Sequence, residues 1–564
     1  MIQSIDYYAV APLLVLAFTA GLVLLLDAFL PHRPYARPLL GAVTLAGVLG
    51  ALGAVVAQAT RGGGPMRTFC VPAGLSGPTR AGISAFDPKI LESGDAGQFW
   101  SGRGMPVNAT SAPCSFVVDD FTLIFAGLAL AAGVIVVLLS MAELSSGDVP
   151  VGEWYFLLLC TLVGAAALPA SRDLVMLVVA LELVSLPVFA LTALKRYDGR
   201  SSEAAVKLFL VSVVSTAVML FGVSLLYGMT GTVYLDRLAQ VLREPVTGAA
   251  AGSEQAAPAA GAASDAYTST LQIAHDLPPV LTVAVVLVLA GFAFKVAAVP
   301  FHAWAGDVYQ GAPVPVAALL SVISKAAGFA GLILILVAAL RGQAAVWAPL
   351  VAIIAALTMT VGNLLALRQH HAVRLLAWSS VAQSGYILAP LGVRDDEAMG
   401  ASIAYLVFYA AMNLGAFAVV MLVSRRGARS EVDDYRGLAF RNPAAGLALA
   451  FFLICLAGLP PGLAGLFAKI VVFRGIVDGG GAWLAVVMAV NTVIGLYYYV
   501  AWVMRIFTPI PVTEGAEAPA AGDSRTEWVP VAVAIVLAGI VAVVFSAAPQ
   551  VVLDLLPETF IASG

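Results

Sequence analysis

Apolar residues occur along the chain in long runs rather than in short alternating patterns. Uncharged runs extend from Leu39 to Thr60, from Phe121 to Ala142, from Ala344 to Leu367 and from Trp528 to Leu553. A helix needs roughly 20 apolar residues to cross a bilayer, whereas the strands of a membrane barrel alternate apolar and polar residues. The pattern therefore predicts an all-α integral membrane protein.

Charged residues, glycines and prolines divide these runs into about fourteen predicted transmembrane helices. The helices are expected to begin near positions 8, 38, 117, 153, 173, 203, 278, 313, 344, 373, 398, 443, 480 and 527. The seventh is interrupted by Pro300, and the twelfth by the run Gly458-Leu459-Pro460-Pro461-Gly462. Because proline removes a backbone hydrogen bond, both are predicted to be broken helices.

The two breaks stand in opposite order to the nearest lysines: Lys295 precedes Pro300, whereas Lys469 follows Pro460 and Pro461. Corresponding interrupted helices are typical of inverted repeats. We therefore expect a five-helix repeat at 151–342, with an outer insertion at 231–276, and a second, inverted one at 343–508. Residues 1–150 would add three helices and an outer loop at 61–116, and 509–564 a cytoplasmic loop and the last helix.

The basic residues predict the orientation in the membrane. Most lie in odd-numbered loops: Arg33, Arg37, Lys195, Arg196, Arg200, Arg368, Arg374, Arg425, Arg426, Arg429, Arg436, Arg441, Arg505 and Arg525. The short even-numbered loops hold Arg172, Arg341, Arg394 and Arg474. Since basic loops stay in the cytoplasm, both termini are expected on the outer side. Residues 1–8 lack Lys and Arg, so we expect the first helix to be retained rather than cleaved as a signal peptide.

Composition narrows the range of functions. With 61% hydrophobic and 11% charged residues and a mean hydropathy of +0.96, the chain is unlike a water-soluble protein, and its net charge of −4 forms no basic face for nucleic acid. The four cysteines include no pair with metal or redox spacing, and there is no glycine-rich nucleotide loop. We therefore expect no cofactor or metal in this chain. Cys70 and Cys114 share the first outer loop, where a disulfide and two free thiols both remain open.

Four charged residues stand alone within predicted spans: Glu182, Lys295, Lys325 and Lys469. A charge at the bilayer centre costs roughly 2.5–3.5 kcal/mol, so each needs a partner or water. One ion pair that only holds helices together would account for two of them. Three lysines with one carboxylate leave excess positive charge, which burial relieves by favouring neutral lysine. The row of titratable groups therefore favours a proton relay over packing alone.

Lys207 and His302 are weaker candidates for the same path. Lys207 lies about one turn into the sixth span, so its side chain could instead extend to the cytoplasmic surface. His302 follows the break at Pro300 and could carry protons near neutral pH, or could simply bind the backbone that the break exposes. His370 and His371 lie beside Arg368 and Arg374 in a cytoplasmic loop, where a surface role is favoured.

The sequence resembles a known family, the antiporter-like subunits of respiratory complex I, and within it the subunit N group. The most specific segment runs from Phe294 to Lys325, FKVAAVPFHAWAGDVYQGAPVPVAALLSVISK. Further similar motifs are Leu181-Glu182-Leu183, Ser202-Glu203-Ala204 before Lys207, Arg374-Leu375-Leu376-Ala377-Trp378-Ser379-Ser380, and Gly458-Leu459-Pro460 with Lys469. The chain departs from the family at Gly306, where proline is common, and in its longer outer loops.

The resemblance implies that NADH, FMN, iron–sulfur clusters and quinone belong to partner subunits, and that the energy released there drives protons through this chain in a bacterial inner membrane. Our mechanistic hypothesis makes Glu182 and Lys295 a coupled pair, Lys325 the central relay and Lys469 the outward exchange site. Lys207 would modulate the input side. Two alternatives remain open: a stand-alone sodium/proton antiporter, and a structural membrane subunit that does not pump.

Overall fold

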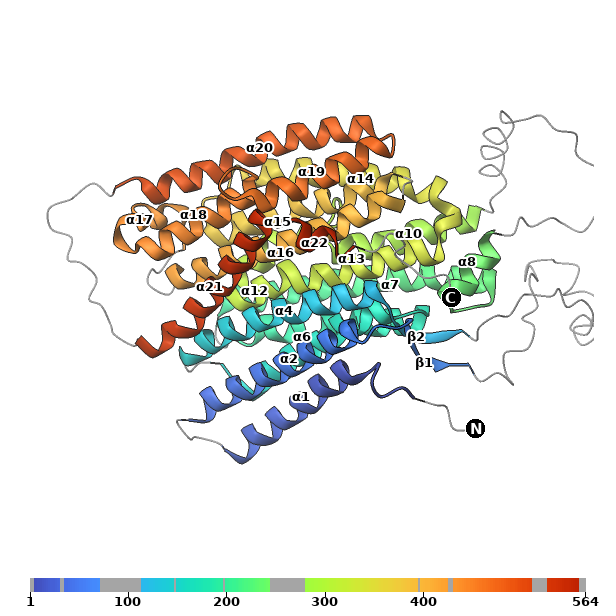
Figure 1. Ribbon diagram of the computed structural model, residues 1–564, viewed down its shortest axis with the longest axis horizontal. Coiled ribbons are helices and arrows are strands. Elements are labelled where there is room, and N and C mark those ends of the chain that lie inside the picture. The colour runs from blue at the N-terminus through green and yellow to red at the C-terminus, as the bar shows by residue number, and fades with distance from the viewer. Residues whose placement is uncertain are drawn as a thin grey trace, which may run out of the picture.

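The computed structural model describes residues 5–30, 35–71, 113–146, 149–195, 198–243, 279–393, 396–424, 430–509 and 525–556. Most helices lie side by side along the long axis of the molecule, with α1 and α2 at one edge and α20 at the other (Figure 1). Eleven described helices are long and apolar enough to cross a membrane. The chain is therefore a multi-pass membrane protein, as the apolar runs predict.

The N-terminal helices follow the predicted spans closely. They are α1 (Ala11–Phe29), α2 (Ala36–Thr60), α4 (Asp120–Glu143), α5 (Val151–Ala167), α6 (Leu174–Ala193) and α7 (Gly199–Thr230). Aspartates fix three of the starts, because the side chains of Asp119, Asp173 and Asp198 accept hydrogen bonds from backbone N–H groups of the first turn.

The C-terminal helices include the two that the sequence predicts to be broken. They are α10 (Pro279–Lys295), α11 (Trp304–Gly311), α12 (Val314–Leu319), α13 (Lys325–Ile333), α14 (Ala344–Ala366), α15 (Ala372–Leu388), α16 (Asp396–Ser424), α17 (Leu438–Arg441), α18 (Pro443–Ala457), α19 (Leu463–Asp478), α20 (Ala482–Phe507), α21 (Arg525–Ala547) and α22 (Gln550–Leu553). Helical structure is thus present at each of the predicted spans. Their number of membrane crossings and their repeat symmetry stay predictions.

Both predicted breaks are present. The first separates α10 from α11 and contains a cis peptide bond between Val299 and Pro300. The second separates α18 from α19, with Gly458 at a φ of +83° directly after α18 and a cis bond between Pro460 and Pro461. Glycine adopts that left-handed conformation without steric cost, so it ends α18. Each break leaves helix-end backbone groups inside the bundle.

A two-stranded sheet at one end of the bundle was not predicted from the sequence. Strands β1 (Met66–Cys70) and β2 (Cys114–Val118) pair antiparallel near the start of α1 (Figure 1). A disulfide joins Cys70 to Cys114, which decides the alternative that the sequence left open. Residues 72–112, the rest of the loop predicted at 61–116, lie outside the described residues.

The predicted insertion at 231–276 begins with a helix rather than an irregular loop. This helix, α8 (Leu235–Arg243), is amphipathic and buries Leu235 and Leu238 completely. It packs against the helical segment Leu334–Ala339, so its apolar face explains why it is ordered. Residues 244–276 lie outside the described part of the chain.

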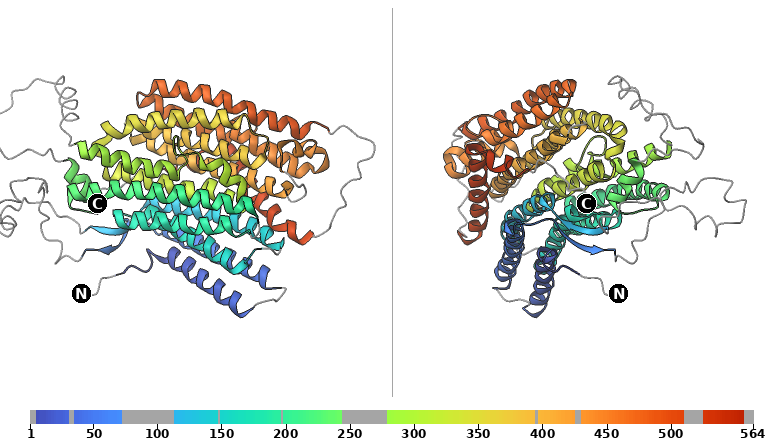
Figure 2. Two further views of the ribbon diagram at one scale, coloured as in Figure 1. Left: turned by 180° about the vertical axis from the view of Figure 1, so that it is seen from behind. Right: turned by 45° about the vertical axis from the view of Figure 1, so that its right-hand side comes forward.

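The most enclosed helices are α16 and the segment from α12 to α13, whereas α1, α7 and α21 expose much of their surface. Helix α21 crosses the bundle obliquely and packs on α4, α16 and α19, as the reverse view also shows (Figures 1 and 2). Apolar side chains on the exposed helices match a lipid environment. Lys295, Lys325 and Lys469, by contrast, are buried among the helices.

Candidate functional site

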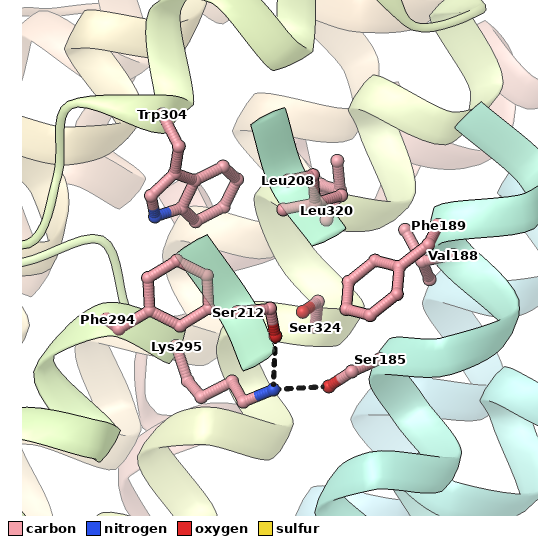
Figure 3. Close-up of a pocket in the computed structure, with 10 residues that line it drawn as sticks. All are labelled: Ser185, Val188, Phe189, Leu208, Ser212, Phe294, Lys295, Trp304, Leu320 and Ser324. Atoms are coloured by element: carbon pink, nitrogen blue, oxygen red, sulfur yellow. Dashed lines mark hydrogen bonds between the residues drawn. The ribbon is translucent and has the colours of Figure 1, made fainter. Parts of the chain in front are cut away.

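Glu182 of α6 and Lys295, the last residue of α10, form an ion pair inside the first half of the bundle. Their Oε1 and Nζ atoms are 3.4 Å apart. Lys295 Nζ also donates to Ser185 Oγ at 2.6 Å and to Ser212 Oγ at 3.2 Å (Figure 3). Thr216 donates to Glu182 at 2.7 Å. Each charged group of the ion pair therefore also has at least one hydroxyl group as a hydrogen-bond partner.

A small cavity adjoins this pair. It offers about 20 Å³ to the centres of water molecules, which is enough for about one water. Ser185, Ser212 and Lys295 line one part, and Ser324, the residue before Lys325, lines another (Figure 3). Phe294 and Trp304 form an apolar wall. The cavity thus connects the surroundings of Lys295 with the helix that carries Lys325.

Lys325 is almost completely buried, with 1% of its surface exposed. It begins α13, directly after a π-helical segment at Leu320–Ser324, a geometry that is frequent at functional sites. Its Nζ donates to the backbone carbonyl and to the hydroxyl of Ser380, and it lies 5.6 Å from the centre of the Tyr409 ring. Within the described residues, no carboxylate forms an ion pair with it.

Lys469 of α19 is held by the break in its own helix. Its Nζ donates to the carbonyls of Leu456 at 3.2 Å and Ala457 at 2.7 Å, the last residues of α18. Carbonyls at a helix end have no partner within the helix and carry the negative end of its dipole, so they suit a cation. The Tyr386 ring lies 5.9 Å away. The broken helix therefore supplies the hydrogen-bond acceptors that stabilise this buried lysine.

Between Lys325 and Lys469 lies a cluster of buried polar side chains that the sequence analysis did not single out. It consists of Asn363, Ser379, Gln383, Tyr386, Tyr405, Asn491, Tyr498 and Tyr499. Asn363, Gln383 and Asn491 are amides inside apolar helices, which was the available signal. Charge alone guided the selection of candidates, so neutral groups were passed over.

Lys207 lies about two turns into α7, where 43% of its side chain is exposed. It pairs with Glu203 at 2.7 Å and with Asp307 at 2.9 Å, and Asp307 also pairs with Arg374 at 2.8 Å. Lys207 therefore combines partial exposure, one of the two alternatives from the sequence, with ion pairs that link α7, α11 and α15. The sequence analysis did not select Asp307, because only the two lysines and His302 of the segment Phe294–Lys325 were considered as site residues.

His302 lies in the first break, with its ring 5.8 Å from that of Trp378. Among the described residues, no hydrogen bond joins its Nδ1 atom to a partner. Gly306 lies against the same Trp378, where an added Cβ would come within 2.9 Å of the ring. His371 and Glu431 share an isolated β-bridge.

The described part of the chain contains no group of three His, Cys, Asp or Glu side chains suited to a metal ion. The polar groups of the candidate site are instead buried lysines, one carboxylate and many hydroxyls. Ammonium groups next to hydroxyls can hand protons on, since a hydroxyl both donates and accepts a hydrogen bond. The arrangement is suited to proton transfer.

Comparisons with known proteins agree on one family. Residues 171–495 match the family described as NADH:quinone oxidoreductase/Mrp antiporter, TM. The chain is 45% identical to NADH-quinone oxidoreductase subunit N 2 of Streptomyces griseus, over 98% of this chain and 93% of that one. It is 40% identical to NADH-quinone oxidoreductase subunit N of Salinispora tropica, over 98% of this chain and 99% of that one.

Solved structures give the same result. A chain of respiratory complex I from Thermus thermophilus, solved with bound aureothin, has a TM-score of 0.65 and 27% identity, and the match covers 96% of this chain and 98% of that one. A chain of the Mrp complex from Dietzia has a TM-score of 0.72 at 20% identity, covering 98% and 96%, which shows a shared fold. The chain therefore belongs to the NADH:quinone oxidoreductase/Mrp antiporter family of membrane subunits, in its NADH-quinone oxidoreductase subunit N group.

Proposed function

We propose that this chain carries protons across a bacterial inner membrane as a subunit of NADH–quinone oxidoreductase, through Glu182, Lys295, Lys325 and Lys469. Oxidation of NADH and reduction of quinone, with FMN and iron–sulfur clusters, belong to partner subunits in this proposal. The subunit N relatives and the complex I structure support this assignment of the whole chain. The site geometry supports the role of the four residues.

One observation carries the proposal: three lysines are buried in one bundle with a single carboxylate paired to one of them. Lys325 and Lys469 are surrounded by a hydroxyl or freed carbonyls rather than by a counter-ion, and Lys295 shares its ion pair with two serine hydroxyls. Burying fixed charges in this way gains little stability, because desolvation offsets the Coulomb attraction. Groups that exchange protons explain the arrangement better than groups that only hold helices together.

The contacts indicate an order of events. A proton on Lys295 can leave when the ammonium turns from Glu182 toward Ser185 and Ser212, which already accept hydrogen bonds from it. The adjoining cavity has room for a water that could take this proton toward Ser324 and Lys325. Lys469, beside the second break, would then exchange the proton with the outer side. Removing any one charge should alter the others, since such sites titrate as a set.

The variant Glu182→Gln tests the pair at its carboxylate. The amide keeps the size of the side chain and leaves Ser185 and Ser212 with Lys295, so we expect proton translocation to fall by about tenfold rather than to zero. It is measured in vesicles containing the assembled enzyme, supplied with NADH and quinone in sodium-free medium. Translocation by the variant at the wild-type rate would contradict the relay. If the wild-type enzyme translocated protons only after sodium was added, the antiporter alternative would be favoured.

For Lys207→Ala we expect a partial loss of turnover, by about two- to fivefold, because exposed ion pairs contribute little and Arg374 still holds Asp307. The same vesicle assay measures it, with Lys195→Ala as the matched control. Lys195 is another exposed lysine near the same helix and pairs only with Asp198 among the described residues. Equal activity of both variants would remove Lys207 from the input side.

A further inference from the structure

The cluster between Lys325 and Lys469 contains two routes, each a series of contacts made partly of hydrogen bonds and partly of ring contacts. The first starts at Ser380, which binds Lys325, and continues from its neighbour Ser379 to the hydroxyl of Tyr499. Gln383 Nε2 donates to that hydroxyl at 3.2 Å, while Gln383 Oε1 accepts from Tyr405 at 2.5 Å.

The first route ends at Lys469. The Tyr405 ring stacks on that of Tyr386, with centroids 6.0 Å apart, and Lys469 lies over Tyr386. All these aromatic residues are at least 96% buried. Side chains from α15, α16 and α20 thus lie in series between the two lysines, with Gln383 in the middle. The step from Tyr405 to Tyr386 is a ring stack, and the step from Tyr386 to Lys469 is a cation–π contact.

The second route also contains an amide in its middle. The ring of Tyr498 lies 4.4 Å from that of Tyr499, and Tyr498 donates to Asn363 Oδ1 at 3.0 Å. Asn363 Nδ2 donates to the Tyr386 hydroxyl at 3.2 Å. The described hydrogen bonds that lead from Tyr499 and Tyr498 toward Tyr405 and Tyr386 are therefore made by Gln383 and Asn363.

An amide differs from a hydroxyl in how it can handle a proton. A hydroxyl oxygen accepts and donates at the same atom, so a row of hydroxyls can pass a proton along by exchanging hydrogen bonds. An amide accepts only at oxygen and donates only at nitrogen. It can align its neighbours, but a proton that arrives at the oxygen does not leave from the nitrogen.

We propose that Gln383 and Asn363 form a proton barrier between Lys325 and Lys469, and that Gln383 blocks the shorter route. Both amides are positioning residues: they order the tyrosine hydroxyls and separate the central lysine from the outward one. In the conformation described here, a proton on Lys325 does not reach Lys469 along the side chains. Proton transfer between the two lysines requires a rearrangement that bypasses the amides. Quinone chemistry in partner subunits could control the transfer by driving that rearrangement.

This inference rests on the proposed relay, because a barrier has a purpose only if both lysines carry protons. Without it, protons driven outward could return along the same tyrosines when the enzyme is at rest. Channels that conduct without leaking protons use the same principle, the orientation of donors and acceptors along the path. The predicted property is therefore low passive leak.

The decisive variant is Gln383→Glu, studied in the assembled enzyme in vesicles. A neutral carboxylic acid has the shape of the amide and keeps both contacts, but it can accept a proton on one oxygen and release one from the other. We expect the passive decay of an imposed pH gradient, with no NADH present, to become about tenfold faster. The number of protons translocated per NADH should fall at the same time.

Two further variants make the comparison specific. Asn413→Asp makes the same chemical change at an equally buried amide, which contacts Ser321 and lies on neither route, so its leak should equal that of wild type. Gln383→Leu removes the amide without supplying a proton carrier, so its leak should not rise. If Gln383→Glu fails to assemble, Asn363→Asp asks the same question on the second route.

A wild-type leak in an assembled Gln383→Glu enzyme would overturn the barrier, as would an equal leak in Asn413→Asp. Failure of the relay itself would look different. In that case Lys325→Ala would translocate protons normally, whatever the Gln383 variants do. Loss of translocation in Lys325→Ala together with a tight Gln383→Glu would reject the barrier and leave the relay standing.

Discussion

Replacing Lys295 with alanine should stop proton translocation and NADH–quinone turnover together. Lys295 belongs both to the ion pair with Glu182 and to the lining of the described cavity, where it is the only titratable side chain. Loss of a proton-transferring group costs about 100-fold or more in rate. Both activities should fall by at least that factor, because coupling prevents turnover when protons cannot move. Turnover is followed by NADH absorbance and translocation by a pH-sensitive dye in vesicles.

The Lys295→Ala variant also leaves a carboxylate without its charged partner, which could damage the fold by itself. The double variant with Glu182→Gln removes that unpaired charge, so restored assembly without restored activity would assign the defect to proton transfer. Lys195→Ala serves as the control for losing a lysine. An assembled Lys295→Ala enzyme that pumps at wild-type rate would reject the relay and favour the structural alternative.

Replacing Lys325 should have an effect of similar size, about 100-fold, because it is the central buried ammonium of the proposed path. Arginine at this position separates the two explanations for such a loss. A guanidinium keeps the positive charge and can still donate to Ser380, but it does not release its proton in proteins. We therefore expect Lys325→Arg to assemble and to remain inactive in both assays.

A structural role for Lys325 predicts the opposite result, in which arginine rescues activity that alanine abolishes. Arg474→Ala is a suitable control for removing a basic residue, since Arg474 is 82% exposed and pairs with Asp478 on its own helix. It should retain wild-type turnover. Active Lys325→Arg would show that charge, and not proton release, is what this position supplies.

Much of this architecture could be predicted from the sequence because the bilayer simplifies the problem. Uncharged runs have to form helices where no water can satisfy the backbone, so the spans and their starts follow from composition. Pro300 and the Gly458–Gly462 run marked both breaks, because proline cannot donate a backbone hydrogen bond within a helix and glycine readily ends one. The buried charges were conspicuous since apolar helices exclude them unless they have a function. Nothing in the sequence, however, gave distances between residues on different helices.

The tertiary structure decided which groups surround each charge. Residues such as Ser185, Ser212 and Ser380 are ordinary in sequence, and they accept hydrogen bonds from the lysines only because α6, α7 and α15 pack against the lysine-bearing helices. The disulfide depended on β1 and β2 meeting in register.

By itself, then, the sequence determined a helical membrane protein with two broken helices and a few charges inside apolar segments, because hydrophobicity and charge act locally along the chain. Only the packing of distant helices decided the contacts of Glu182 with Lys295, of Lys469 with the end of α18, and of Gln383 with two tyrosines. Hydrogen bonds act over about 3 Å, so proton paths are set by three-dimensional neighbours rather than by spacing in sequence.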